Sequence, residues 1–462
     1  MEAKTHHIRS GPEGSQGFSS VATLPGHSEP RWNLAFLGIL AYLVIEYTRL
    51  PAMFPFLVPF QVGKVAIGLS VLGLAVAGRT PRVGRRSGIS IDIALAFFLL
   101  ASFLSALQAH AQTKGWAQFI DTVQWCIIYF LISRIVSSSW RMRVFVFILL
   151  LLNLKLAQFA VRGYFAGQAY GRSAEFMASR GVGGGSTGFF GNAGDFGVAM
   201  CVIWPLAGML LLGESKRIPR LILLASFTAF SGAILVCGSR GAFLAAVLTA
   251  LVASVRNLRK FGVAFLFLML IPGFFYLLPE GSKDRLRSAL HWQQDETASI
   301  RIGLWKAGIR MFGDHPILGV GPGNFGQEYA NRYAGPGEDP ETWVPHSIYI
   351  QALSELGLVG TIPLLLLVVS YFRLNGRTLK NYRARGKEGQ RAMGQYMARG
   401  LNLAMVGYLL SGAFLAVLYY PHLWVLLGLS VALNTVSVPG QAAAGGAELE
   451  DQEQTFALAV PG

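Results

Sequence analysis

Long runs of apolar residues alternate with short polar stretches along most of the chain. The runs are continuously apolar, which excludes the alternating pattern of a membrane β-barrel strand. A helix needs roughly 20 such residues to cross a bilayer, because every backbone polar group in lipid must find a partner within its own segment. The pattern therefore predicts an all-α, polytopic transmembrane helical bundle with about twelve spans. The expected spans are 32–50, 57–78, 89–110, 116–136, 142–161, 189–212, 218–237, 240–255, 261–278, 346–372, 399–418 and 421–436.

Basic residues between the expected spans fall in alternate loops, which predicts how the chain is oriented. These loops are 79–86, 134–143, 216–220, 256–260 and 373–399. All of them lie on one side of the membrane if the N-terminus is cytoplasmic, as the positive-inside rule requires. We therefore expect both termini in the cytoplasm and the longest loop, 279–345, on the outer side.

Composition shifts divide the chain into five parts. Polar, small-residue-rich tails at 1–30 and 437–462 predict cytoplasmic disorder, and the first tail lacks the basic and apolar regions of a signal peptide. Between them we expect N-terminal transmembrane helices at 31–230, a core at 231–372 that contains the outer loop, and C-terminal transmembrane helices at 373–436. Within the outer loop, residues 297–312 have helical apolar spacing, which predicts a short amphipathic helix at the membrane interface.

The net charge of +15 does not predict nucleic-acid binding, because the excess lies mostly in the short loops just described. Cys126, Cys201 and Cys237 all fall inside apolar spans, which predicts buried packing residues. Metal-ligand spacing and phosphate-cradling glycine motifs are absent from the sequence. We therefore expect no metal and no nucleotide cofactor.

A histidine at the start of a span is the first candidate catalytic residue. His346 follows Pro345, and proline favours the first turn of a helix. The positive end of the helix dipole disfavours protonation of a nearby imidazole, which keeps the ring available as a base. The alternative interpretation is an interfacial histidine that only packs.

Several cations on the expected outer side are candidate phosphate ligands. Arg240 lies in a tight turn between two spans, and Arg301 stands one helical turn before Trp305. Arg172 and Arg180 lie in a glycine-rich outer loop, where the positive-inside rule gives no reason for them. Arginine binds phosphate bidentately and stays charged. Snorkelling at a helix end, interfacial anchoring or simple solvation are the alternatives.

Two carboxylates fall inside expected spans. Glu355 follows His346 by nine residues, which places it on the opposite face of an ideal helix and excludes a simple triad. We expect its buried carboxylate to pair with an arginine on a neighbouring helix. Asp195 opens the sixth span, where the preceding Gly191 and Asn192 suggest a turn and a helix cap.

Four motifs occur in the chain in a familiar order. They are Gly-Ser-Arg-Gly-Ala at 238–242, the Arg301…Trp305…Asp314-His-Pro-x-x-Gly-x-Gly-Pro-Gly-Asn-Phe block at 301–325, His-Ser-x-Tyr…Glu355-x-Gly-x-x-Gly at 346–360, and Tyr-Tyr-Pro at 419–421. Together they resemble the O-antigen ligase/polymerase superfamily, bacterial membrane glycosyltransferases of the GT-C type.

The resemblance implies an activity and a place. Such enzymes transfer a glycan from an undecaprenyl-diphosphate carrier to a lipid or glycan acceptor at the periplasmic face of the bacterial inner membrane, in lipopolysaccharide or exopolysaccharide synthesis. It implies a metal-independent, inverting reaction without a cofactor. Membrane lipid and polysaccharide-assembly proteins are the further partners that it suggests.

The resemblance also assigns roles. His346 would be the catalytic base, and Arg240 and Arg301 would hold the diphosphate. An arginine of the glycine-rich loop, Arg172 or Arg180, would join them. Glu355 and Trp305 would support the site.

Three function classes remain open at this stage. Ligase and polymerase are not separated, because the acceptor site would lie on variable loops. A flippase for lipid-linked oligosaccharides is the second class, although it predicts repeat symmetry and charges throughout the bundle. A membrane scaffold without catalysis is the third.

Overall fold

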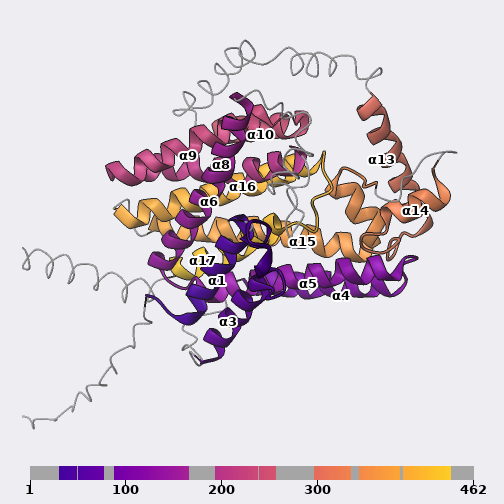
Figure 1. Cartoon of the computed structure of the whole chain (residues 1–462), viewed down its shortest axis with the longest axis horizontal. Coiled ribbons are helices and arrows are strands. Elements are labelled where there is room, and N and C mark those ends of the chain that lie inside the picture. Colours follow the sequence, from indigo (N-terminus) through magenta and orange to yellow (C-terminus); the bar gives the residue numbers. More distant parts are fainter. Residues whose placement is uncertain are drawn as a thin grey trace, which may run out of the picture.

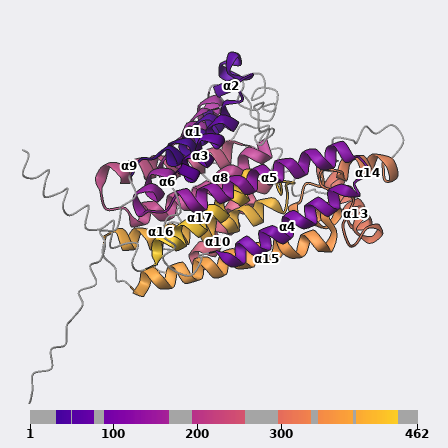
Figure 2. The ribbon, with the colours of Figure 1, turned by 90° about the horizontal axis from the view of Figure 1, so that it is seen from below.

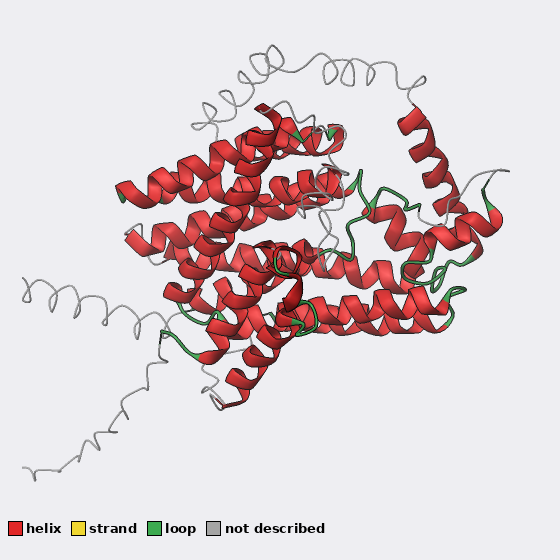
Figure 3. Cartoon of the chain, in the orientation of Figure 1, coloured by secondary structure: helices red, strands yellow, loops and turns green. Residues whose placement is uncertain are grey.

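The computed structural model describes residues 31–48, 50–76, 88–165, 193–237, 239–255, 296–334, 343–384 and 389–438. All regular structure within them is helical, which confirms the all-α prediction (Figures 1 and 3). The elements are α1 (Leu34–Thr48), α2 (Leu50–Met53), η1 (Pro55–Leu57), α3 (Val62–Val76), α4 (Ile89–Leu107), α5 (Gln112–Ile135), α6 (Ser139–Phe165), α8 (Ala193–Gly213), α9 (Arg217–Val236), α10 (Arg240–Val255), α13 (Glu296–Asp314), α14 (Phe325–Arg332), α15 (Ile348–Ala384), α16 (Gly389–Gly412) and α17 (Pro421–Ser437).

Every predicted span overlaps one of these helices except 261–278, which lies outside the described residues. Among the helices that the structure describes, five are long and apolar enough to cross a membrane: α4, α6, α8 from Gly194, α9 and α15. Four more are apolar but shorter, namely α1, α3, α10 and α17. The chain is thus a multi-pass helical membrane protein, and the number of twelve spans stays a prediction. The predicted tails lie outside the described residues, apart from positions 437 and 438.

Helix α17 forms the centre of the bundle. Almost all of its residues are buried, and it packs against α5, α15, α16 and α6. Three side-chain hydrogen bonds fix its register against α15: Ser430 to Asn375 at 3.0 Å, Asn434 to Thr378 at 2.7 Å and Asn381 to Ser437 at 3.0 Å. Such interhelical bonds matter in lipid, because an apolar medium offers no other partner for a polar side chain.

Helices α13 and α14 form a small outer subdomain with its own apolar cluster. Figures 1 and 2 show both helices beyond the end of the bundle at which α4 turns into α5. The cluster consists of Leu304, Ala307, Met311, Val320 and Phe325, with Tyr329, Tyr333 and Trp343 packed against it. The predicted helix at 297–312 is confirmed, and it extends from Glu296 to Asp314.

Candidate functional site

Helix α15 is broken at Gly357, and the break organises the site. Gly357 has φ 59° and ψ −159°, a conformation essentially restricted to glycine. Four backbone hydrogen bonds of 2.9–3.1 Å to residues 316–321 replace the interrupted helical ones: Val320 N to Ser354 O, Gly321 N to Glu355 O, Leu358 N to Pro316 O, and Val359 N to Ile317 O. The glycine-rich segment is therefore held against α15 by its own backbone.

The side chain of Glu355 holds the next part of this segment. Its Oε2 accepts hydrogen bonds from the Tyr419 hydroxyl at 2.8 Å and from the Gly323 N–H at 3.1 Å. Glu355 is 2% exposed. The expected arginine partner is wrong for the described residues, because a phenol and backbone N–H groups satisfy the carboxylate instead. Glu355 therefore supports the glycine-rich loop.

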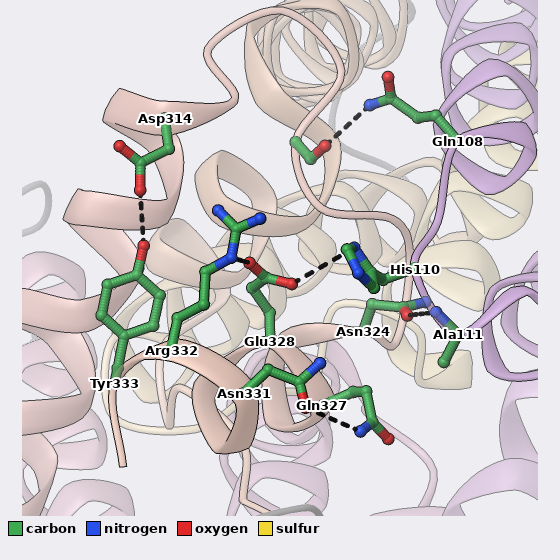
Figure 4. A network of polar contacts seen from close by, with 11 residues as sticks. Gln108, His110, Ala111, Asp314, Asn324, Gln327, Glu328, Asn331, Arg332 and Tyr333 are labelled. Atoms are coloured by element: carbon green, nitrogen blue, oxygen red, sulfur yellow. Dashed lines mark hydrogen bonds and ion pairs between the residues drawn. The ribbon is translucent and has the colours of Figure 1, made fainter.

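Helix α4 and the α4–α5 turn fix the same segment from the other side. The Ser105 hydroxyl lies 2.7 Å from the Leu318 carbonyl, and Gln108 donates to the Gly319 carbonyl at 2.8 Å. The Ala111 N–H donates to the Asn324 side chain at 2.8 Å (Figure 4). The sequence interpretation missed these contacts, since serine, glutamine and asparagine at loop edges carry no spacing signal.

His346 precedes α15 and does not lie in its first turn. The helix begins at Ile348, and His346 has φ +46°, the left-handed region that non-glycine residues rarely adopt. The expectation that His346 lies in the first turn of its helix is therefore wrong. The ring is half-buried, and its Nδ1 is buried without a hydrogen-bond partner among the described residues. A strained backbone that presents an unsatisfied ring nitrogen is typical of a functional position.

Helix α13 supplies two neighbours of His346. The Trp305 indole N–H donates to the Pro345 carbonyl at 2.9 Å, directly before the histidine. Burial lowers the pKa of His346 to about 4, and the positive charge of Arg301 contributes to that lowering. The imidazole is therefore neutral at physiological pH and stands beside a permanent cation. The structure thus brings His346, Arg301 and Trp305 together.

The segment at the end of α16 connects the backbone beside Arg240 to the backbone near His346. It is the first residue of α10, directly after the short 237–239 connection from α9. The backbone of Gly241 packs against the Phe414 side chain, and Gly412 packs against Ile348. One short segment, 412–414, therefore contacts both the residue after Arg240 and the start of α15 two residues after His346.

Asp195 lies in the first turn of α8 and is 4% exposed. It accepts a hydrogen bond from the Tyr420 hydroxyl at 3.2 Å. The preceding residues of the expected turn and cap, 191 and 192, lie outside the described part of the chain. The motif at 419–421 is part of the family resemblance, but the sequence does not indicate which carboxylates its tyrosines bind.

Arg172 and Arg180 lie outside the described residues, so their expected role stays a prediction. Of the remaining candidates, Arg301, Trp305 and His346 form one group, Glu355 anchors the neighbouring loop, and Arg240 stands across the 412–414 segment.

A family model matches part of the chain. Residues 224–365, which include Arg240, the glycine-rich segment and His346, match a family model described as O-Antigen ligase. None of the curated proteins compared with the chain matches it. The family assembles surface polysaccharides, and its members are glycosyltransferase-like ligases and polymerases that act on lipid-linked glycans and their acceptors in a membrane. The match confirms the resemblance to the O-antigen ligase/polymerase superfamily over residues 224–365.

Proposed function

We propose that the protein transfers a glycan from an undecaprenyl-diphosphate carrier to a lipid or glycan acceptor at the periplasmic face of the bacterial inner membrane, with both termini in the cytoplasm. The observation that carries the proposal is the pairing of a neutral, strained His346 with the Arg301 cation inside the stretch that matches the O-antigen ligase family model. A neutral imidazole can accept a proton, and a neighbouring guanidinium can hold a diphosphate.

The reaction follows as a single displacement. The acceptor hydroxyl oxygen attacks the anomeric carbon while its proton passes to His346. The bond between that carbon and the diphosphate oxygen breaks, and the electron pair leaves with the diphosphate. Arg240 and Arg301 stabilise the charge that develops there, with Arg172 or Arg180 as a further contact. One displacement inverts the anomeric centre, and diphosphate leaves without a general acid or a metal.

The supporting side chains act through these groups. Trp305 holds the Pro345 carbonyl, so it limits the motion of the backbone that presents His346. Glu355 holds the glycine-rich segment against α15. Positioning of this kind contributes strongly to rate, because a displacement of about 1 Å costs up to ~100-fold.

The lipid-linked glycans of a strain that lacks the gene test the proposal. Full-length polymer that accumulates on undecaprenyl diphosphate in the outer leaflet identifies a ligase, and single repeat units that accumulate there identify a polymerase. Wild type should restore the normal profile, and His346→Ala at equal expression should not. Glycans trapped in the inner leaflet would contradict the proposal and identify a flippase.

A further inference from the structure

We propose that Tyr419 and Tyr420 form a positioning bridge that sets the His346 half of the site against the Arg240 half. The two residues are adjacent in the chain, and each hydroxyl binds a buried carboxylate from a different part of the molecule: Glu355 on α15 and Asp195 on α8. This inference rests on the proposed function, because it concerns the alignment of that site.

The first end of the bridge reaches the glycine-rich segment. The Tyr419 hydroxyl and the Gly323 N–H share one oxygen of Glu355. One turn earlier on α15, the Gln351 side chain accepts the Leu418 N–H at 3.3 Å. Segment 418–419 is therefore bound to α15 at two successive turns, on the part of the helix that begins next to His346.

The second end reaches the helix that Arg240 begins. Asp195 stands in the first turn of α8, and Gly197 on the following turn packs against Ala242 and Ser239. The Cys201 thiol lies 3.1 Å from the Ala242 carbonyl. The start of α8 is therefore fixed against the start of α10, and Tyr420 connects this pair of helices to the α15 side.

The backbone between the two hydroxyls is suited to such a connection. Tyr420 has φ −89° and ψ 158°, an extended conformation in which successive side chains point to opposite sides. Pro421 follows and starts α17, the buried central helix. The bridge is therefore short, and the segment that carries it is fixed in the core of the bundle through α17.

If both hydroxyls are needed to align the site, substitutions of the two tyrosines should have non-additive effects on kcat. Loss of either hydroxyl should separate the two halves, so a second loss should add little. Ground-state binding tolerates small misalignment better than the transition state does. We therefore expect Tyr419→Phe and Tyr420→Phe each to lower kcat by about tenfold or more while the donor KM changes by less than about threefold. The double variant should resemble the singles.

Tyr371→Phe is the matched control. Its side chain is buried and its hydroxyl donates to the Leu401 carbonyl at 2.7 Å, but it joins α15 to α16 away from the site. It should lose comparable thermal stability, since a buried hydrogen bond contributes about 1 kcal/mol, and it should keep its kcat.

The experiment uses the full chain in lipid nanodiscs, with donor lipid and acceptor extracted from the null strain. Asp195→Ala should reproduce the Tyr420→Phe effect and add nothing to it. A wild-type kcat for Tyr420→Phe, or multiplicative losses in the double variant, would overturn the bridge while wild-type turnover upholds the proposed function. Absence of turnover by wild type would overturn the proposed function and the bridge with it.

Discussion

Trp305 donates its indole N–H to the carbonyl oxygen of Pro345 at 2.9 Å, so the outer subdomain directly holds the backbone that presents His346. Because His346 sits at φ +46°, this backbone would relax if it were released. The hydrogen bond thus connects the fold of the outer helices to the candidate catalytic group.

Trp305→Phe keeps an aromatic ring but removes the donor. We expect transfer to fall by about fivefold, since one hydrogen bond contributes about 1 kcal/mol and each 1.4 kcal/mol is a factor of about ten in rate. Trp343→Phe is the control, because Trp343 packs against Tyr329 and the apolar cluster of the same subdomain. Equal activity losses in the two variants would contradict a specific role for the Trp305 donor.

The pH dependence of transfer tests the pairing of His346 with Arg301. With the pKa of His346 lowered to about 4, the ring is neutral above that value, and the rate should fall only as the pH drops through it. Arg301→Gln removes a positive charge that disfavours protonation. The pKa of His346 should therefore rise, and the acid limb of kcat should move to higher pH.

Arg310→Gln on the same helix makes the same change of charge at an exposed position and should leave the acid limb in place. The rate of each variant is measured from about pH 3 to pH 8, so that the scan covers the acid limb on both sides of a pKa of about 4. An acid limb that stays at its wild-type position in Arg301→Gln would show that the guanidinium does not act on His346.

The break in α15 predicts opposite outcomes for two glycines of one helix. Gly357→Ala should destabilise the protein by at least about 1–3 kcal/mol, because alanine is strained at φ 59° and its Cβ would collide with the Ile317 carbonyl. Gly376→Ala meets no atom within 4 Å and should be neutral or stabilising by up to ~1 kcal/mol. Thermal unfolding in detergent measures both. Equal melting temperatures would mean that the break is not required.

Hydrophobic periodicity predicted the helices well, because continuous apolar runs leave few alternatives to a spanning helix. The same periodicity could not reveal the interruption at Gly357, since one glycine inside an apolar run is compatible with an intact helix. At that break, backbone carbonyl and N–H groups of α15 form hydrogen bonds with residues 316–321.

The sequence also offered cations and a histidine as candidates for the site, because polar residues in or beside membrane spans are costly and often functional. The partners of Glu355 and Asp195 could not be predicted, because two tyrosine hydroxyls more than 60 residues along the chain from either carboxylate satisfy them. Contacts of this range depend on how helices pack, which periodicity does not encode.

A buried carboxylate of α14 faces the turn between α4 and α5 and gives a fourth prediction. Glu328 is 2% exposed; Arg332 Nε lies 2.8 Å from one of its oxygens and His110 Nδ1 lies 3.8 Å from the other (Figure 4). Glu328→Gln removes the charge and keeps the shape. A loss of about 1.5 kcal/mol would raise the open population about tenfold, and limited proteolysis of α14 should accelerate accordingly.

Lys114→Ala is the control for that experiment. Its ammonium donates to Gln327 at 3.1 Å between α5 and α14, but the contact is exposed. Exposed polar contacts contribute little, so cleavage should stay near the wild-type rate. Faster cleavage in Lys114→Ala than in Glu328→Gln would contradict the prediction that Glu328 stabilises α14.

Release of undecaprenyl diphosphate by the purified protein tests the central claim most directly. The protein is reconstituted into nanodiscs with lipid-linked glycan and acceptor extracted from the null strain, and the freed carrier and the glycosylated product are measured by mass spectrometry. We expect wild type to form both in equal amounts and His346→Ala, at matched folding, to form neither above background. Equal release by wild type and His346→Ala would contradict the assignment of His346 as the catalytic base.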